Sequence, residues 1–107
     1  MKKIIVLFFV VIAFNKCSKP PNACFTHYPS DINAGDVVTF DADCSKNASY
    51  FEWSFGDGSA DTNTVNKSVT HKYMASGTYI VKLNVKGKDG VTLKEGKPET
   101  SISITVQ

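Results

Sequence analysis

The sequence predicts an all-β protein that folds as an antiparallel β-sandwich of about seven strands. From residue 23 to the end of the chain, apolar and polar residues alternate with a period of two. Glycine, proline and aspartate interrupt this alternation at short intervals, as turns between antiparallel strands require. The same part of the sequence contains no long stretch with the spacing of an α-helix.

The first three expected strands lead to a glycine-rich turn. Residues 24–28 form a short strand that ends at a proline. Residues 36–43 follow, with apolar side chains at alternate positions on one face. Aromatic side chains alternate again in residues 51–55, where we expect Trp53 to fill the space between the two sheets. The segment Gly-Asp-Gly-Ser at 56–59 then predicts a turn.

The second half of the chain has a polar segment and two longer strands. Residues 60–67 are polar and are expected to form a loop. Residues 68–73 form another strand, and the clearest alternation follows at 77–85. A turn at 89–90 and a stretch at 91–100 rich in lysine, glutamate and glycine precede the last strand. The expected inward residues of the two long strands are Tyr79, Val81, Leu83, Val85, Ile102, Ile104 and Val106.

The charge distribution argues against binding to nucleic acid. The chain of 107 residues has 12 lysines, no arginine and 10 acidic residues, a net charge of +2. Lys2, Lys3 and Lys16 lie in the first 16 residues, so the remaining chain carries more acids than lysines. Domains that bind nucleic acid are strongly basic, and no such partner is expected here. The length also excludes a large enzyme with two domains around a cleft.

The N-terminal residues have the pattern of an export signal. Two lysines precede an apolar run at residues 4–14. As a helix this run is roughly 16 Å long, about half the thickness of a bilayer core, which favours a secretory signal over a transmembrane anchor. Cys17 follows the run and resembles the cysteine of the lipobox in bacterial lipoproteins, which is lipidated and becomes the new N-terminus.

The lipobox resemblance predicts the domain organisation. Residues 1–16 are expected to be a lipoprotein signal peptide, residues 17–22 the lipidated cysteine and a flexible tether, and residues 23–107 the folded domain. Phe14 and Lys16 depart from the usual box, as in the looser boxes of Bacteroidetes-like lipoproteins. The alternative is that Cys17 is a spare thiol beside a poorly cleaved leader.

Cys24 and Cys44 remain as an even pair in an exported chain, and an oxidising compartment makes a disulfide the default for such a pair. The spacing of the cysteines and of His27 and His71 does not suggest a zinc site. A redox or catalytic thiol would need a base and a positive pocket that the sequence does not show. We therefore expect a structural disulfide.

Three ordered motifs carry a family resemblance: Phe-x-Trp-x-Phe-Gly-Asp-Gly-Ser from residue 51, His-x-Tyr from residue 71, and Gly-x-Tyr-x-Val-x-Leu-x-Val from residue 77. Together they resemble the polycystic kidney disease (PKD) domain over roughly residues 23–107. The chain departs from the family at Ser54, where aspartate is usual, and at Phe51, where tyrosine is common. The motif residues are Phe51, Trp53, Phe55, Gly56, Asp57, Gly58, His71, Tyr73, Gly77 and Tyr79.

The resemblance implies an immunoglobulin-like β-sandwich. Members of the family act as extracellular modules that bind proteins or polysaccharides, or as spacers beside catalytic domains. Paired cysteines before the second strand and near its end recur in lipoprotein members, which supports the pair Cys24 and Cys44. Some members bind calcium, and Asp57 and Asp61 are weak candidates for such a site. Because Ser54 removes one carboxylate, we favour a glycine turn in which Asp57 bonds its own backbone, and we expect no metal or other cofactor.

The sequence does not contain a catalytic constellation. His71 is a possible base, but no nucleophile motif accompanies it, so we expect a packed or hydrogen-bonded strand residue. Asp41 and Asp43 alternate outward on a strand, as on a solvated face. An enzymatic activity is therefore not expected.

Tyr28 and Tyr50 are candidates for exposed side chains that contact a ligand, by stacking on sugar rings or by anchoring a protein partner. The alternative is that they cap the ends of the sandwich. The leading hypothesis is a lipid-anchored, non-enzymatic interaction module of the bacterial envelope that binds a protein or polysaccharide. It is expected at the outer membrane, on the periplasmic face because the residues after Cys17 lack an acidic export signal. The alternative function is a structural spacer or an assembly subunit of an envelope complex.

Overall fold

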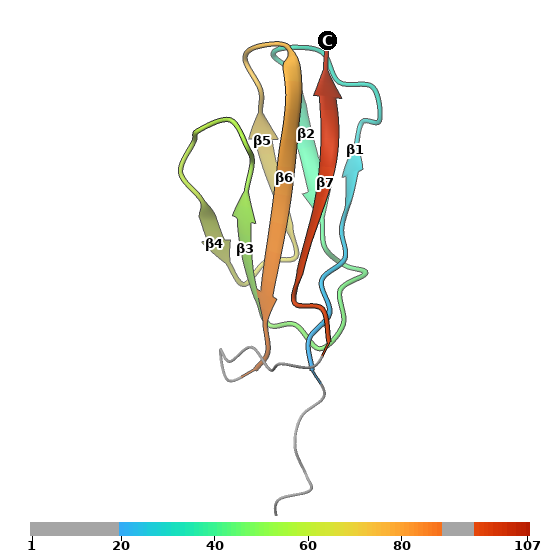
Figure 1. The fold of residues 1–107 in the computed structure, drawn as a ribbon, viewed down its shortest axis with the longest axis vertical. Helices are drawn as coiled ribbons and strands as arrows, with labels where there is room; N and C mark the ends of the chain where they lie inside the picture. Colours follow the sequence, from blue (N-terminus) through green and yellow to red (C-terminus); the bar gives the residue numbers. More distant parts are fainter. Residues whose placement is uncertain (1–19, 89–95) are drawn as a thin grey trace, which may run out of the picture.

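A computed structural model describes residues 20–88 and 96–107 and contains seven β-strands in these residues. In chain order they are β1 (Thr26–Tyr28), β2 (Val37–Asp41), β3 (Tyr50–Ser54), β4 (Thr62–Thr64), β5 (Ser68–Lys72), β6 (Gly77–Lys86) and β7 (Glu99–Val106). One sheet has the strand order β1-β2-β5 and the other the order β4-β3-β6-β7 (Figure 1). All five strand pairs are antiparallel, which confirms the predicted all-β sandwich.

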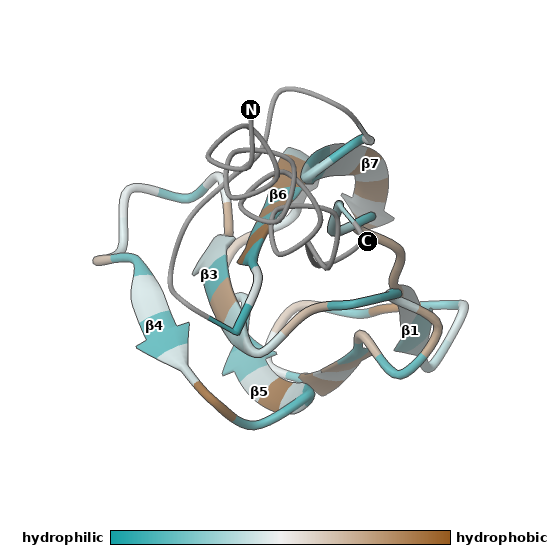
Figure 2. Ribbon diagram, turned by 90° about the horizontal axis from the view of Figure 1, so that it is seen from below, coloured by the Kyte–Doolittle hydropathy of each residue, from teal (hydrophilic) through white to brown (hydrophobic). Residues whose placement is uncertain are grey.

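The two sheets form two layers, which are seen along the long axis of the sandwich in Figure 2. The core between them consists of the inward-facing residues that the alternation predicts. Trp53 is fully buried, with its ring centroid 5.2 Å from that of Phe25 and 5.9 Å from that of Phe40. Because Phe40 belongs to β2 and Trp53 to β3, this aromatic contact joins the two sheets. The remaining buried core residues are Ile32, Val38, Ala42, Phe51, Phe55, Tyr73, Val81, Leu83, Val85, Ile104 and Val106.

The prediction of a loop at residues 60–67 is wrong for its central part. Thr62–Thr64 form strand β4, which pairs with β3 and places Thr62 opposite Trp53 and Thr64 opposite Phe51. These polar residues have no strand pattern of their own. The open edge of β3 makes them a strand, because it offers a row of backbone groups that a neighbouring chain segment can bond.

The packed domain begins earlier than the expected boundary at residue 23. Pro21 is buried, and Asn22 forms a backbone bridge with Lys46. The side-chain oxygen of Asn22 also accepts a hydrogen bond from the backbone N–H of Lys97 at 2.7 Å. Residues 20–22 were expected to belong to the flexible tether, but these bonds hold them against the sandwich.

The expected signal peptide, Cys17 and the turn at 89–90 lie outside the described residues. Within residues 20–88 and 96–107, no helix is long and apolar enough to cross a membrane.

The disulfide between Cys24 and Cys44 is present, as predicted, and its Cα atoms are 5.4 Å apart. It joins the segment before β1 to the loop after β2. Ser45 supports the same junction: its hydroxyl accepts a hydrogen bond from the backbone N–H of Cys24 at 2.9 Å and donates to the carbonyl of Cys24 at 2.8 Å. The bridge therefore fixes the end of the sandwich at which the described chain begins (Figure 1).

Candidate functional site

The glycine turn after β3 is held by the carboxylate of Asp57. Its Oδ1 accepts hydrogen bonds from the backbone N–H of Ser59 at 3.1 Å and from the Ser59 hydroxyl at 2.6 Å. Its Oδ2 lies 2.7 Å from Nε2 of His71 on β5. Partial burial acts to raise the pKa of Asp57, but the bonds from Ser59 and His71 outweigh it and lower that pKa to about 2. The carboxylate therefore ties the turn to the other sheet.

Aromatic contacts extend this connection into the core. The His71 ring stacks on Phe55, with ring centroids 4.1 Å apart, and contacts Tyr73 edge-on. The hydroxyl of Tyr73 donates a hydrogen bond of 2.8 Å to the carbonyl of Phe55, and burial raises the pKa of Tyr73. Tyr79 stacks on Tyr73 and donates to the carbonyl of Ala75 at 2.7 Å. These motif residues form one structural cluster that holds β3, β5 and β6 together.

The hydrogen-bond partners of Asp57 are also relevant to a catalytic role and to calcium binding at this turn. Ser59 donates its hydroxyl to Asp57 and not to His71, so the carboxylate stands between the hydroxyl and the imidazole. A hydrolytic triad needs the opposite order, with the base next to the nucleophile. Both carboxylate oxygens of Asp57 are engaged by neighbouring side chains, and Asp61 is exposed in the following loop. The observed bonds match the glycine-turn interpretation of Asp57.

Asp41 and Asp43 are exposed near the end of β2. Oδ1 of Asp41 accepts a hydrogen bond from the backbone N–H of Asp43 at 2.9 Å, and Asp43 lies 3.6 Å from the ammonium of Lys67. The two carboxylates thus take part in local surface contacts.

The two candidate tyrosines lie on opposite faces of the sandwich. Tyr28 is the last residue of β1, pairs with Thr39 and is 76% exposed on the outer face of the three-stranded sheet. Tyr50 is the first residue of β3, pairs with Lys86 and is 41% exposed on the outer face of the four-stranded sheet. The structure therefore does not bring them into one site.

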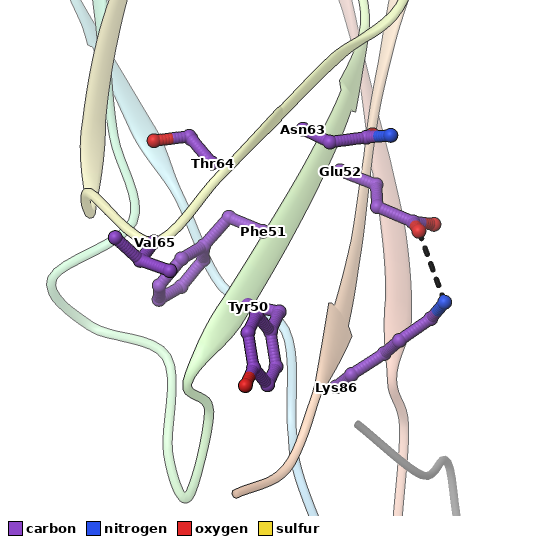
Figure 3. Close-up of a pocket in the computed structure, with 7 residues that line it drawn as sticks. All are labelled: Tyr50, Phe51, Glu52, Asn63, Thr64, Val65 and Lys86. Carbon is purple, nitrogen blue, oxygen red and sulfur yellow. Dashed lines mark ion pairs between the residues drawn. The ribbon is translucent and has the colours of Figure 1, made fainter. Parts of the chain in front are cut away.

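A cleft of about 460 Å³ lies beside Tyr50. Glu52, Asn63 and Lys86 project to the same side of the sheet, and Nζ of Lys86 lies 3.0 Å from Oε2 of Glu52 (Figure 3). Tyr50 lies at one end of this group. The other lining residues are Phe51, Thr64 and Val65. The cleft thus combines a half-exposed aromatic ring with a carboxylate, an amide and an ammonium group.

A row of polar residues continues across the four-stranded sheet. Asn63, Glu52, Asn84 and Glu99 lie opposite one another on β4, β3, β6 and β7. Glu52, Asn84 and Glu99 also line a second cleft of about 250 Å³, together with Lys82. The side-chain oxygen of Asn84 is buried and has no hydrogen-bond partner within the described residues. Asn84 lines this second cleft and not the cleft beside Tyr50.

Tyr50 is predicted from the sequence as a ligand contact, whereas its polar neighbours are not. The alternation of β3 and β6 places Glu52, Asn84 and Lys86 on the outer face, and this signal is present in the sequence. The outward position of Asn63 could not be predicted from the alternation, because its segment is expected to be a loop. Strand register, which sets these residues opposite one another, is also not encoded in the alternation itself.

The comparisons with known proteins concern nearly the whole domain. The family model of the PKD domain matches residues 18–102. A comparison with curated protein sequences found no match. One similar solved structure is described by the words "Structural basis for the promiscuous specificity of the carbohydrate-binding modules from the beta-sandwich super family". It is 31% identical, with a TM-score of 0.71 over 83% of this chain, and this chain spans 35% of its length.

A second solved structure, the PKD1 domain of Vibrio anguillarum Epp, has a TM-score of 0.62 at 20% identity and shows the same fold. The alignment covers 85% of this chain and 98% of that domain. The family model covers more than half of the chain, and its motif residues build the cluster around Asp57, His71 and Tyr73. The chain belongs to the PKD domain family.

Proposed function

We propose that this chain is a non-enzymatic binding module of the bacterial envelope, held to a membrane by a lipid on Cys17, and that its ligand is a polysaccharide. The observation that carries the choice of ligand is the cleft beside Tyr50, in which an exposed aromatic ring adjoins polar side chains of three kinds. The bound chain lies on the outer face of the four-stranded sheet.

The chemistry of sugars fits this cleft. A pyranose ring presents C–H groups on its faces and hydroxyl groups on its rim. Tyr50 offers an apolar ring for the face at a small cost in side-chain entropy. Glu52 offers carboxylate oxygens that accept hydrogen bonds from hydroxyl groups, Asn63 offers an amide, and Lys86 offers a donor. A mostly apolar cleft with a few polar groups is the usual composition of a small-ligand site.

The comparison with the carbohydrate-binding modules supports the same class of ligand, since that structure shares the sandwich and 31% of the aligned residues. The alternative is a structural spacer, with no ligand at the Tyr50 cleft. A binding module needs Tyr50 to contact its ligand, whereas a spacer needs Tyr50 for folding alone.

Affinity electrophoresis tests the ligand directly. The unlipidated chain from residue 18 onward is run in native gels that contain one of a panel of neutral polysaccharides. We expect at least one polysaccharide to retard the protein and Tyr50→Ala to abolish the retardation. Tyr28→Ala is the matched control, because it removes the other exposed tyrosine from the opposite face. Equal urea midpoints for the three proteins exclude unfolding as the cause.

Two results contradict the proposed ligand. Mobility that no polysaccharide changes would favour the spacer. Retardation that persists in Tyr50→Ala and disappears in Tyr28→Ala would move the site to the three-stranded sheet.

The anchor rests on the sequence, namely the short apolar run at residues 4–14 and the cysteine that follows it. Mass spectrometry of the N-terminal peptide from the membrane fraction tests it. We expect residues 1–16 to be missing and Cys17 to carry acyl chains. An unmodified Cys17 on a full-length chain would overturn the anchor and leave the polysaccharide site untouched.

A further inference from the structure

The outer face of the four-stranded sheet carries a second cleft next to the one beside Tyr50. Glu52 lines both clefts, so they meet at this residue in the middle of the sheet. The second cleft, of about 250 Å³, extends from Glu52 over Asn84 on β6 to Glu99 on β7. We call the two clefts, joined at Glu52, the double cleft.

The register of the strands sets the length of the double cleft. Asn63, Glu52, Asn84 and Glu99 lie opposite one another across β4, β3, β6 and β7. Neighbouring strands are about 4.8 Å apart, so the row of four residues spans roughly 14 Å. This length exceeds the width of one pyranose ring. The cleft beside Tyr50, by comparison, reaches only from β4 to β6.

Both ends of this row are open within the described residues. Asn63 and Glu99 are exposed, and β4 and β7 are the edge strands of the sheet. A pocket with a closed end receives the terminus of a chain, whereas a groove that is open at both ends lets a longer chain continue past it. Residues 20–88 and 96–107 therefore present an open groove across the strands and not a pocket for one sugar.

The second cleft contains an acceptor without a partner. Oδ1 of Asn84 is buried and has no hydrogen-bond partner among the residues that the structure describes. A buried acceptor of this kind has lost its hydrogen bond to water without replacing it. The terminal torsion of asparagine has a broad range, so the amide can turn this oxygen toward a hydroxyl group in the cleft. A ligand hydroxyl over Asn84 then supplies the missing donor.

The charges of the double cleft favour a neutral ligand. Its lining residues include three acids, Glu52, Asp61 and Glu99, and two lysines, Lys82 and Lys86. Nζ of Lys86 lies 3.0 Å from Oε2 of Glu52, so these two charges compensate each other (Figure 3). A polyanionic or a polycationic chain meets charges of its own sign on this face, which opposes binding. A neutral chain of hydroxyl-bearing sugars meets none.

We propose that the double cleft binds an internal segment of a linear, neutral polysaccharide that runs across the strands from Tyr50 to Glu99, a proposal that rests on the proposed polysaccharide ligand. Tyr50 stacks on one sugar unit, and Glu52 and Asn84 accept hydrogen bonds from the units that follow. Because the groove is open at both ends, the chain continues past the protein on either side. The module therefore recognises the middle of a chain and not its ends.

Isothermal titration calorimetry with oligosaccharides of increasing length tests the double cleft. The native-gel panel contains hydroxyethyl cellulose, xylan, mannan and soluble starch, and the one that retards the protein selects the cello-, xylo-, manno- or malto-oligosaccharides as probes. We expect affinity to rise from the monosaccharide to at least the trisaccharide, because each added unit reaches further along the row. A bulky label on the reducing end of the hexasaccharide should leave its affinity unchanged, since that end lies outside the groove.

Two variants separate the second cleft from the cleft beside Tyr50. Glu99→Ala removes the far end of the row, and Asn84→Ala removes the acceptor in its middle. Each should weaken binding of the hexasaccharide about three- to tenfold, the effect of one lost hydrogen bond, and leave the shortest oligosaccharide that binds unaffected. Ser103→Ala is the matched control, because Ser103 is exposed on the same strand but lines neither cleft. Equal urea midpoints exclude unfolding as the cause.

The possible failures are distinguishable. Equal affinities for the monosaccharide and the hexasaccharide, both lost in Tyr50→Ala, would confine the site to the cleft beside Tyr50 and leave the proposed function intact. Hexasaccharide affinity that is unchanged in both Glu99→Ala and Asn84→Ala would also exclude the second cleft. A loss of affinity on labelling the reducing end would overturn internal recognition. Native gels in which no polysaccharide retards the protein would overturn both proposals.

Discussion

At the scale of single residues, the hydroxyl of Tyr73 connects β5 to the end of β3. It donates a hydrogen bond to the carbonyl of Phe55 in a fully buried position. A buried carbonyl that loses its donor cannot be satisfied by water, and its desolvation is then uncompensated. The hydroxyl of Tyr79 makes a bond of similar length to Ala75, but at an exposed site.

Tyr73→Phe is expected to lower the free energy of unfolding by about 1–2 kcal/mol, since it leaves the Phe55 carbonyl without its donor. Tyr79→Phe, the matched control, should lower it by less than about 0.5 kcal/mol, because water replaces the lost hydroxyl. Urea denaturation monitored by Trp53 fluorescence measures both. An equal loss of unfolding free energy in the two variants would show that the buried hydrogen bond stabilises the fold no more than the exposed one.

Asp57 makes the stability of the domain depend on pH. Its pKa is lowered from 3.8 to about 2 in the folded chain, so folding favours the charged carboxylate. A group with a lowered folded pKa stabilises the fold above its unfolded pKa, and this contribution disappears as pH falls through the folded pKa. The stabilisation that the bonds of Asp57 contribute therefore declines as pH falls from about 4 to about 2.

Asp57→Asn should flatten the decline of unfolding free energy over this window, whereas Asp31→Asn, which removes an exposed acid, serves as the comparison. Denaturation curves recorded at intervals from pH 5 to pH 2 give the slopes. A decline in Asp57→Asn as steep as in the parent protein would mean that another carboxylate controls the acid response.

At the scale of secondary-structure elements, the turn after β3 depends on a close approach to β6. Gly56 has φ of +79°, and a Cβ atom at this position would clash with the backbone carbonyl of Ile80. Gly58 has φ of +86°, and a Cβ atom there would meet open space. The two glycines share the backbone conformation and differ in packing.

Gly58→Ala is expected to cost roughly 1–2 kcal/mol, the strain of a left-handed alanine. Gly56→Ala has the same strain plus a clash with the backbone of Ile80, which cannot move without disturbing the β6–β7 pairing, so its loss of stability should be clearly larger. Comparison of urea midpoints measures the difference. Equal midpoints would contradict the close packing of the turn on β6.

The elements differ in how far the sequence predicts them. Strands β2, β3 and β6 have strict alternation, and their inward residues are the observed core. Strand β4 could not be predicted, because its three polar residues are a strand only by pairing with β3. The bond between Asp57 and His71 spans 14 residues and two sheets, so it depends on the tertiary fold and not on the local pattern.

At the scale of the whole molecule, the fold separates the two tyrosines that the sequence offers as candidate ligand contacts. Tyr28 and Tyr50 lie on opposite outer faces of the sandwich. The position of Tyr50 on a strand was predictable, but its cleft was not, because the cleft needs the register of β3, β4 and β6. The polysaccharide proposal therefore depends on this sheet face as a unit.

Chemical-shift mapping tests that face most directly. The ¹⁵N-labelled chain from residue 18 onward is titrated with oligosaccharide fragments of the polysaccharide that retards it most strongly in native gels. We predict that the largest shifts of amide signals fall on β3, β4 and β6 around Tyr50, Glu52, Asn63 and Lys86. Shifts confined to β1, β2 and β5, or an unchanged spectrum at saturating oligosaccharide, would contradict a glycan site on the four-stranded sheet.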